Sequence, residues 1–155
     1  MRAFVPRELV FTVLICVLAL GATVWGSQVA PALAKETFTV IEHADSDTVI
    51  DHGDKGDSIG DTLAFSNDLY DAENANVVGT SQGACTRTAP GKSWECTWTN
   101  ILEDGSIVVQ GPFYDAEDST LAITGGSGKY SGASGEMHLK AREGGTEYEF
   151  TFDVN

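Results

Sequence analysis

Basic residues are scarce in this 155-residue chain. It has 9 lysines and arginines against 23 aspartates and glutamates, which gives a formal net charge of −14 and a pI near 4.3. A protein that binds nucleic acid needs a basic surface to meet the phosphate backbone. The charge balance therefore excludes nucleic acid as an expected partner. It favours solubility and says little about the fold.

Histidine and cysteine are also few, with three of each. The histidines at 43, 52 and 138 do not have the spacing of metal ligands, and the acidic run at 45–61 lacks the glutamate and the offsets of an EF-hand loop. No Ser-His-Asp arrangement, phosphate-binding loop or zinc pattern is recognisable. We therefore expect no metal and no cofactor. Residues 44–60 are interpreted as a solvated acidic loop with room for a short strand at Thr48–Ile50.

The first 34 residues form a separate segment. Two arginines precede an apolar run at 9–25, and residues 32–34 (Ala-Leu-Ala) give the small-x-small pattern of a signal-peptide cleavage site. The alternative is an uncleaved membrane anchor, because the run approaches the shortest length that spans a bilayer. We expect a secreted or extracytoplasmic protein whose domain is 35–155. Contact with a membrane is then expected only through 9–25, if that run stays attached.

After residue 35 the apolar residues no longer recur with the period of a helix. Segments with a period of two alternate instead with turn signals, which is typical of an all-β sandwich or barrel. The strands that we expect are 38–43, 62–70, 77–88, 94–102, 106–114, 120–124, 136–142 and 147–153. The predicted fold is thus all-β, a single antiparallel barrel of about eight strands. A barrel of that size is either filled by side chains or holds one small ligand.

Two turns predict how the central strands pair. Asp104-Gly105 is a strong two-residue hairpin signal, which places Glu103 opposite Ser106. Counting back from that turn puts Trp98 opposite Gly111 and Cys96 opposite Phe113. The turn at 89–92 would place Thr88 opposite Ser93, Cys85 opposite Cys96 and Gly83 opposite Trp98.

Strand alternation then gathers aromatic and polar side chains on one face. Trp94, Trp98 and Phe113 share this face, and so do Glu42, Phe65, Asn67 and Cys85 on their own strands. A mostly aromatic lining interrupted by a few polar groups is the composition of a ligand pocket. Two alternatives stay open at this point: a core that is packed shut, and a register slip that turns Glu42 outward.

Cys85 and Cys96 also carry two alternatives. Directly opposite each other on neighbouring strands, they lie within reach of a disulfide, and an exported protein meets conditions that allow one. The other alternative is a free Cys85 thiol in the pocket.

Three segments resemble plant allene oxide cyclases: residues 60–70, 109–113 and 117–128. The glycine-rich stretch 125–130, with Gly132 and Gly135, is similar to dirigent proteins more broadly. The resemblance spans nearly the whole chain after residue 35. It implies an eight-stranded barrel that binds a reactive hydrophobic molecule, a fatty-acid epoxide or a polyketide, and guides its ring closure. It also implies a homo-oligomer, a trimer or a dimer.

The same resemblance implies roles for individual residues. Glu42 matches the glutamate that steers charge in the opening epoxide, Asn67 the asparagine that helps hold a water at the epoxide oxygen, and Cys85 a cysteine beside the reacting segment. The aromatic pocket positions of the family match Phe65, Trp94 and Phe113. This chain departs from the family pattern at Ala44, where an asparagine is usual, and at Asp57, where a phenylalanine is usual.

These observations lead to an expected function with alternatives. The first is a cyclase or isomerase in which Glu42, Asn67 and Cys85 act on a hydrophobic substrate held by Phe65, Trp94, Trp98 and Phe113. The second is a dirigent-like barrel that binds and orients a hydrophobic ligand without chemistry of its own. A third is a structural or interaction protein whose pocket has filled.

Overall fold

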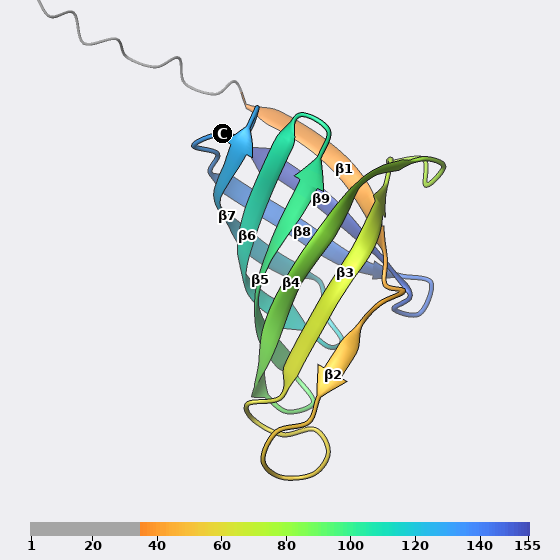
Figure 1. The fold of residues 1–155 in the computed structure, drawn as a ribbon, viewed down its shortest axis with the longest axis vertical. Helices are drawn as coiled ribbons and strands as arrows, with labels where there is room; N and C mark the ends of the chain where they lie inside the picture. The colour runs from red at the N-terminus through yellow and green to blue at the C-terminus, as the bar shows by residue number, and fades with distance from the viewer. Residues whose placement is uncertain (1–34) are drawn as a thin grey trace, which may run out of the picture. The chain divides into compact units, whose positions relative to one another are not determined.

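The computed structural model describes residues 35–155, and the expected signal or anchor segment at 1–34 lies outside the described residues. Alternating apolar residues form nine strands (Figure 1), in agreement with the eight expected strands and the short additional one. Their bounds are β1 Glu36–His43, β2 Thr48–Ile50, β3 Thr62–Tyr70, β4 Val77–Ala89, β5 Ser93–Leu102, β6 Gly105–Tyr114, β7 Ser119–Gly128, β8 Gly135–Arg142 and β9 Glu147–Val154. Within residues 35–155, no helix is long and apolar enough to cross a membrane.

The strands form a closed antiparallel barrel. The order is β1-β9-β8-β7-β6-β5-β4-β3, and β1 also pairs with β3, so that the sheet closes on itself. This closing contact is short, since it joins only Ile41, Glu42 and His43 of β1 to Tyr70, Leu69 and Asp68 of β3. Beyond it the chain turns, and β2 pairs with the first half of β3 as an extra strand. The end of β1 therefore lies beside the last residues of β3, and Ser46 in the following turn bonds to Ser66 and Asn67 just before them.

The β4–β5 hairpin mostly has the predicted register. Cys85 pairs with Cys96, and Gly83 pairs with Trp98, as the turn at 89–92 indicates. The prediction was wrong at the end of the hairpin, where Ala89 rather than Thr88 pairs with Ser93. A bulge between Arg87 and Ala89 takes up the extra residue next to the turn.

The predicted register of the β5–β6 hairpin was wrong by two residues. The loop consists of Glu103 and Asp104, so Leu102 pairs with Gly105, Trp98 with Val109 and Cys96 with Gly111. Gly105 belongs to β6 and is needed there for a different reason than a turn, because a Cβ on it would collide with the backbone oxygen of Ser127 on β7. A shift of two preserves the face of every side chain, so the predicted interior still holds.

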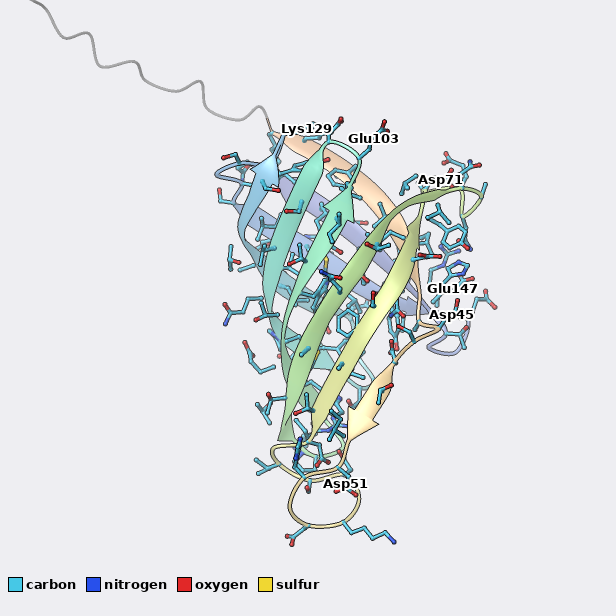
Figure 2. The ribbon with its side chains drawn as sticks, viewed as in Figure 1. Asp45, Asp51, Asp71, Glu103, Lys129 and Glu147 are labelled. Carbon is cyan, nitrogen blue, oxygen red and sulfur yellow. A yellow bond between two sulfur atoms is a disulfide. The ribbon has the colours of Figure 1, made fainter. Side chains whose placement is uncertain are left out.

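The barrel interior is packed with apolar side chains. Charged side chains such as Asp51, Asp71 and Glu103 lie in the loops that connect the strands (Figure 2). The buried core gathers residues of every barrel strand and two from the β7–β8 connection, Tyr130 and Ala133: Val40, Leu63, Leu69, Cys85, Trp94, Cys96, Trp98, Ile107, Val109, Leu121, Ile123, Tyr130, Ala133, Met137, Leu139, Phe150, Phe152 and Val154. Among these apolar residues the interior also contains buried polar side chains, Glu42, Asn67 and Ser81 among them.

Candidate functional site

A small cavity lies inside the barrel, where strands from both ends of the sequence face one another. Its volume is about 30 Å³, the space of a water molecule or two. Pockets for small molecules usually measure about 300 to 1,000 Å³. The expectation of a ligand-sized lumen is thus not met in this conformation, and a substrate would have to displace side chains. The lining comes from β1, β3–β6, β8, β9 and the turn after β1: Glu42, Asp47, Leu63, Phe65, Asn67, Cys85, Cys96, Trp98, Phe113, Leu139, Tyr148 and Phe150.

Glu42 is the buried carboxylate of this cavity. Its residue is 5% exposed, and the hydroxyl of Ser81 on β4 donates a hydrogen bond to its Oε1. Burial raises the pKa of Glu42 to about 7, and the nearby charge of Asp47 acts in the same direction, while hydrogen bonding from Ser81 and Asn67 opposes the rise. A register slip that turns Glu42 outward is therefore excluded. Near neutral pH this group can exist in either protonation state.

Asn67 lies on β3 and holds the turn that follows β1. The backbone N–H and the hydroxyl of Ser46 both donate to its Oδ1, at 3.0 and 2.9 Å, and its Nδ2 donates to Oδ1 of Asp47 at 2.8 Å. The side chain is buried. Asn67 therefore fixes a second carboxylate at the cavity, in addition to lining it.

Asp47 is the functional candidate that sequence reasoning missed. The residue is exposed, yet it lines the cavity, which places it at the cavity's mouth. In the sequence it belongs to an acidic run that reads as a solvated loop. Only the pairing of β2 with β3 folds this part of the run back over the barrel.

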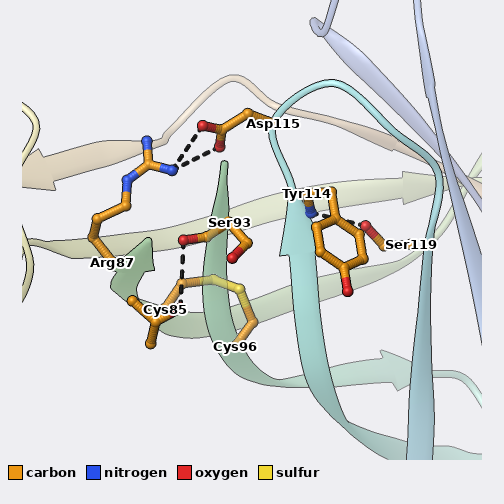
Figure 3. Close-up of a disulfide and its surroundings, with 8 residues drawn as sticks. Cys85, Arg87, Ser93, Cys96, Tyr114, Asp115 and Ser119 are labelled. Carbon is orange, nitrogen blue, oxygen red and sulfur yellow. Dashed lines mark hydrogen bonds and ion pairs between the residues drawn. A yellow bond between two sulfur atoms is a disulfide. The ribbon is translucent and has the colours of Figure 1, made fainter. Parts of the chain in front are cut away.

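Cys85 and Cys96 are joined by a disulfide, and both residues are buried (Figure 3). Of the two alternatives, the structure has the bridge. The bridged sulfurs cannot act as thiols, although both residues line the cavity. Cys85 is thus a wall residue here, and the expected role of a free cysteine beside the reacting atoms does not hold in this state.

Three of the four expected aromatic residues line the cavity. Phe65 and Trp98 contact each other edge to face, with ring centroids 5.9 Å apart, and Phe113 also lines the space. Trp94 does not line it. Its ring lies instead under the guanidinium of Arg87, whose Cζ is 4.0 Å from the ring centroid.

Phe113 and Tyr148 separate the cavity from a larger outer hollow. Their rings pack edge to face with centroids 5.6 Å apart. Both residues, together with Leu139, also line a hollow of about 360 Å³ that is formed by the β6–β7 connection and the β8–β9 turn. Both are only partly buried. Displacing these two rings would join the inner and outer spaces.

The sequence of this chain matches the family model of allene oxide cyclase over residues 10–153. This match covers most of the chain. The protein belongs to the allene oxide cyclase family.

Solved structures similar to this member of the family carry different activities in their names. A pyocyanin demethylase is 27% identical, with a TM-score of 0.68, and the match covers 77% of this chain and 100% of that one. The pterocarpan synthase dirigent protein PsPTS1 is 15% identical, with a TM-score of 0.62 over 78% of this chain and 93% of that one. The Diels-Alderase AbmU from Streptomyces koyangensis is 12% identical, with a TM-score of 0.60 over 77% of this chain and 68% of that one. The last two likenesses show the fold alone.

Three residues of this chain match polar positions of the allene oxide cyclase family. The residues that match the family's glutamate and asparagine, Glu42 and Asn67, both line the cavity of this chain. The residue that matches the family's cysteine, Cys85, is tied to Cys96. In this chain two of the three matching residues thus lie at the cavity with free polar side chains, while the third is part of a disulfide.

Proposed function

We propose that this protein binds a hydrophobic, conjugated small molecule in its barrel and promotes ring closure or isomerisation, with Glu42 and Asn67 as the polar guides. One observation carries the proposal: Glu42 is a buried carboxylate inside an aromatic cavity, and among residues 35–155 the only other charged side chain that lines this cavity is Asp47. Burial of a carboxylate is unfavourable, so a site that keeps one is a candidate for chemistry.

The chemistry that such a site can supply follows from its protonation states. With a pKa raised to about 7, Glu42 can give a proton to a leaving oxygen or accept one near neutral pH. In its ionised form it stabilises positive charge that develops in the ligand, and the surrounding rings strengthen this effect by excluding water. Holding a flexible substrate in one folded shape supplies a further part of the rate enhancement.

Access to the cavity is a necessary part of the proposal. The space in the closed barrel is too small for such a ligand, and the half-buried Phe113–Tyr148 pair stands between it and the outer hollow. We infer that these rings swing outward on binding. Rotation of two aromatic side chains joins the spaces without breaking any strand pairing.

One similar structure supports an enzymatic role. The 27% identical structure is named as a pyocyanin demethylase, which is an enzyme. Export is also part of the proposal: the apolar run at 9–25 and the Cys85–Cys96 bridge both suit an oxidising compartment. A dirigent-like role, in which the barrel only orients its ligand, is the alternative that the experiment separates.

The test combines binding and turnover. Full-length protein is analysed by native mass spectrometry for a co-purified compound, and N-phenyl-1-naphthylamine serves as an uncharged fluorescent probe for the cavity. The co-purified compound is then incubated with the wild type, Glu42→Gln and Asn67→Ala, and its products are separated by chiral chromatography. We expect both variants to bind the probe and to lose turnover by about a hundredfold, within the range of acid–base catalysis.

Each other result has a defined meaning. Turnover and product distribution that stay unchanged in both variants would overturn the enzymatic proposal and leave the dirigent-like role. Failure of the wild type to take up either the probe or any compound would overturn ligand binding itself. Glu136→Gln, which changes an exposed glutamate on β8, is the matched control and should behave as the wild type.

A further inference from the structure

Two carboxylates line the cavity, and both are negatively charged when ionised. Glu42 is buried inside, and Asp47 stands at the mouth. No lysine, arginine or histidine is among the lining residues of this cavity in the described part of the chain. A ligand carboxylate would therefore enter a low-dielectric space that holds two acidic groups and no cation to pair with.

The outer hollow continues this charge pattern. Its lining includes four acidic residues, Asp115, Glu117, Asp118 and Glu143, and a single basic one, Arg142. Arg142 is engaged, since its Nη1 lies 3.7 Å from a carboxylate oxygen of Glu149, and Asp115 is paired with Arg87, which leaves Glu117, Asp118 and Glu143 as the acidic excess. The route to the cavity past Phe113 and Tyr148 is thus electronegative, which attracts cations and repels anions.

An unpartnered donor inside the barrel points independently to a ligand. Trp98 is 3% exposed and lines the cavity. Its indole Nε1–H is buried and has no hydrogen-bond acceptor within residues 35–155. Buried N–H groups almost always have a partner. A ligand with a carbonyl oxygen or a ring nitrogen would supply the missing acceptor.

The aromatic walls complete the description of the ligand. Trp98, Phe65, Phe113 and Tyr148 present ring faces and edges to the space. Such faces favour flat, apolar rings, and they attract a delocalised positive charge through the negative faces of their π systems. Aromatic walls, two carboxylates and one free donor are together complementary to a single kind of molecule.

We propose that the cavity selects planar conjugated molecules that are uncharged or positively charged and carry a hydrogen-bond acceptor, and that it rejects carboxylates such as fatty acids. This inference rests on the proposed function, because it names the substrate class of the same cavity. It narrows the expected substrates by removing the fatty-acid epoxide, whose carboxylate has no cation to meet here. Asp47 then acts as a specificity residue and Trp98 as the donor to the ligand.

The experiment compares three two-ring probes by isothermal titration calorimetry with the full chain at pH 8. N-methylquinolinium is the cation, quinoline is uncharged with a ring nitrogen, and 2-naphthoate is the anion. We expect the cation and quinoline to bind at least about tenfold more tightly than 2-naphthoate, the size of a modest electrostatic preference. Asp47→Asn should lower the affinity for N-methylquinolinium about fivefold and leave the affinity for quinoline unchanged, as expected for the loss of one nearby charge.

Controls separate this cavity from the general charge of the protein. Asp68 follows Asn67 on β3, and its carboxylate is exposed. Asp68→Asn removes this charge and should leave the affinities for all three probes unchanged. Trp98→Phe removes the indole donor and should weaken the binding of quinoline. The binding of naphthalene, an additional probe without a hydrogen-bond acceptor, should not weaken. Binding of naphthalene to Trp98→Phe also shows that the variant is folded.

The outcomes distinguish this inference from the proposed function. Equal or tighter binding of 2-naphthoate would overturn the charge selection, while uptake of quinoline would leave the proposed function standing. An equal effect of Asp47→Asn and Asp68→Asn would show that the preference comes from net charge, and would overturn the role of Asp47. If none of the three probes and no N-phenyl-1-naphthylamine binds, both proposals fail together.

Discussion

The hydroxyl of Ser81 on β4 donates a hydrogen bond to the carboxylate of Glu42 on β1, across the interior of the barrel. The two residues are 39 positions apart in the sequence, and both are buried. The bond stabilises the ionised carboxylate and so offsets part of the effect of burial on the pKa of Glu42. The protonation state of the site is therefore set by both strands.

The pH dependence of stability should reveal Glu42. Because the pKa of Glu42 rises from 4.5 in the unfolded chain to about 7 in the folded protein, the folded state binds the proton more tightly. The contribution to stability is full below pH 4.5 and is lost as the pH rises through 7, by about 3 kcal/mol at most. Glu42→Gln should remove this loss, which urea unfolding at pH 4.5 and pH 8 measures. A parallel pH dependence in the wild type and the variant would contradict a raised pKa, and Glu136→Gln controls for the loss of a surface charge.

Removal of the Ser81 hydroxyl should raise the pKa of Glu42 further. Ser81→Ala takes away a donor that favours the ionised form, so the pKa should move upward from about 7, by roughly half a unit to one unit. Titration of the Glu42 carboxyl carbon by NMR measures the shift. Thr80→Ala, on the adjacent position of β4, is the control that should leave the pKa of Glu42 in place. A pKa that falls in Ser81→Ala would be inconsistent with the hydrogen bond.

The disulfide should stabilise the barrel without taking part in catalysis. Cys85 and Cys96 close a loop with a sequence separation of 11. Closing a loop of that length is worth about 3 kcal/mol, so the double variant Cys85→Ala/Cys96→Ala should lose about that much free energy of unfolding. Uptake of N-phenyl-1-naphthylamine and turnover should persist, because the bridged sulfurs only line the wall. A folded double variant that binds the probe but turns nothing over would assign chemistry to the cysteines instead.

Arg87 should hold the acidic loop against the barrel. Its side chain is 9% exposed, its Nε lies 2.6 Å from Oδ1 of Asp57, and its Nη1 donates to Asp115 at 2.7 Å. Arg87→Gln leaves two partly exposed carboxylates without their partner and takes the guanidinium off the Trp94 ring, which together should cost about 1 to 2 kcal/mol. The freed loop should then be cut faster by trypsin after Lys55. Arg142→Gln, which removes a half-exposed ion pair, should change neither quantity by much, and equal cleavage in both variants would refute this role.

Gly83 should be intolerant of any side chain. A Cβ at this position would collide with the Cβ of Trp98, its partner on β5, and with the carbonyl oxygen of Thr97. Gly83→Ala should push the indole out of place and lower the free energy of unfolding by about 1 to 3 kcal/mol or more. Urea denaturation followed by tryptophan fluorescence measures this loss. The exposed neighbour Gln82 provides the control, since Gln82→Ala should leave stability within about 0.5 kcal/mol.

The sequence predicts the inward-facing side chains of this protein better than the register of its strands. Alternation with a period of two predicts which side chains face inward, and every expected inward residue of the β5 hairpins is found there. The predicted register of β5 with β6 was wrong by two residues, because Gly105 fits close strand contact as well as it fits a turn. That error did not affect Glu42 on β1 or Asn67 on β3, whose inward faces follow from the alternation of their own strands.

The residues that complete the site were not predictable in the same way. Asp47 reaches the cavity because the chain turns after β1 and Asn67 binds that turn, both of which depend on contacts between distant strands. The edge-to-face pair of Phe113 and Tyr148 joins β6 to β9, which are not neighbours in the sheet. Trp94 shares its inward face with Trp98, yet Arg87 covers it. No local pattern contains such information.

The sequence by itself determined the class of fold, the inward set of side chains and the position of the two cysteines opposite each other, because these follow from alternation and from one turn. Only the tertiary structure decided how wide the interior is, whether the two cysteines are bridged, which carboxylates line the cavity and which rings stand between it and the outer hollow. The physical reason is that strand periodicity specifies a direction for each side chain, whereas the size and charge of an enclosed space depend on all the strands that surround it.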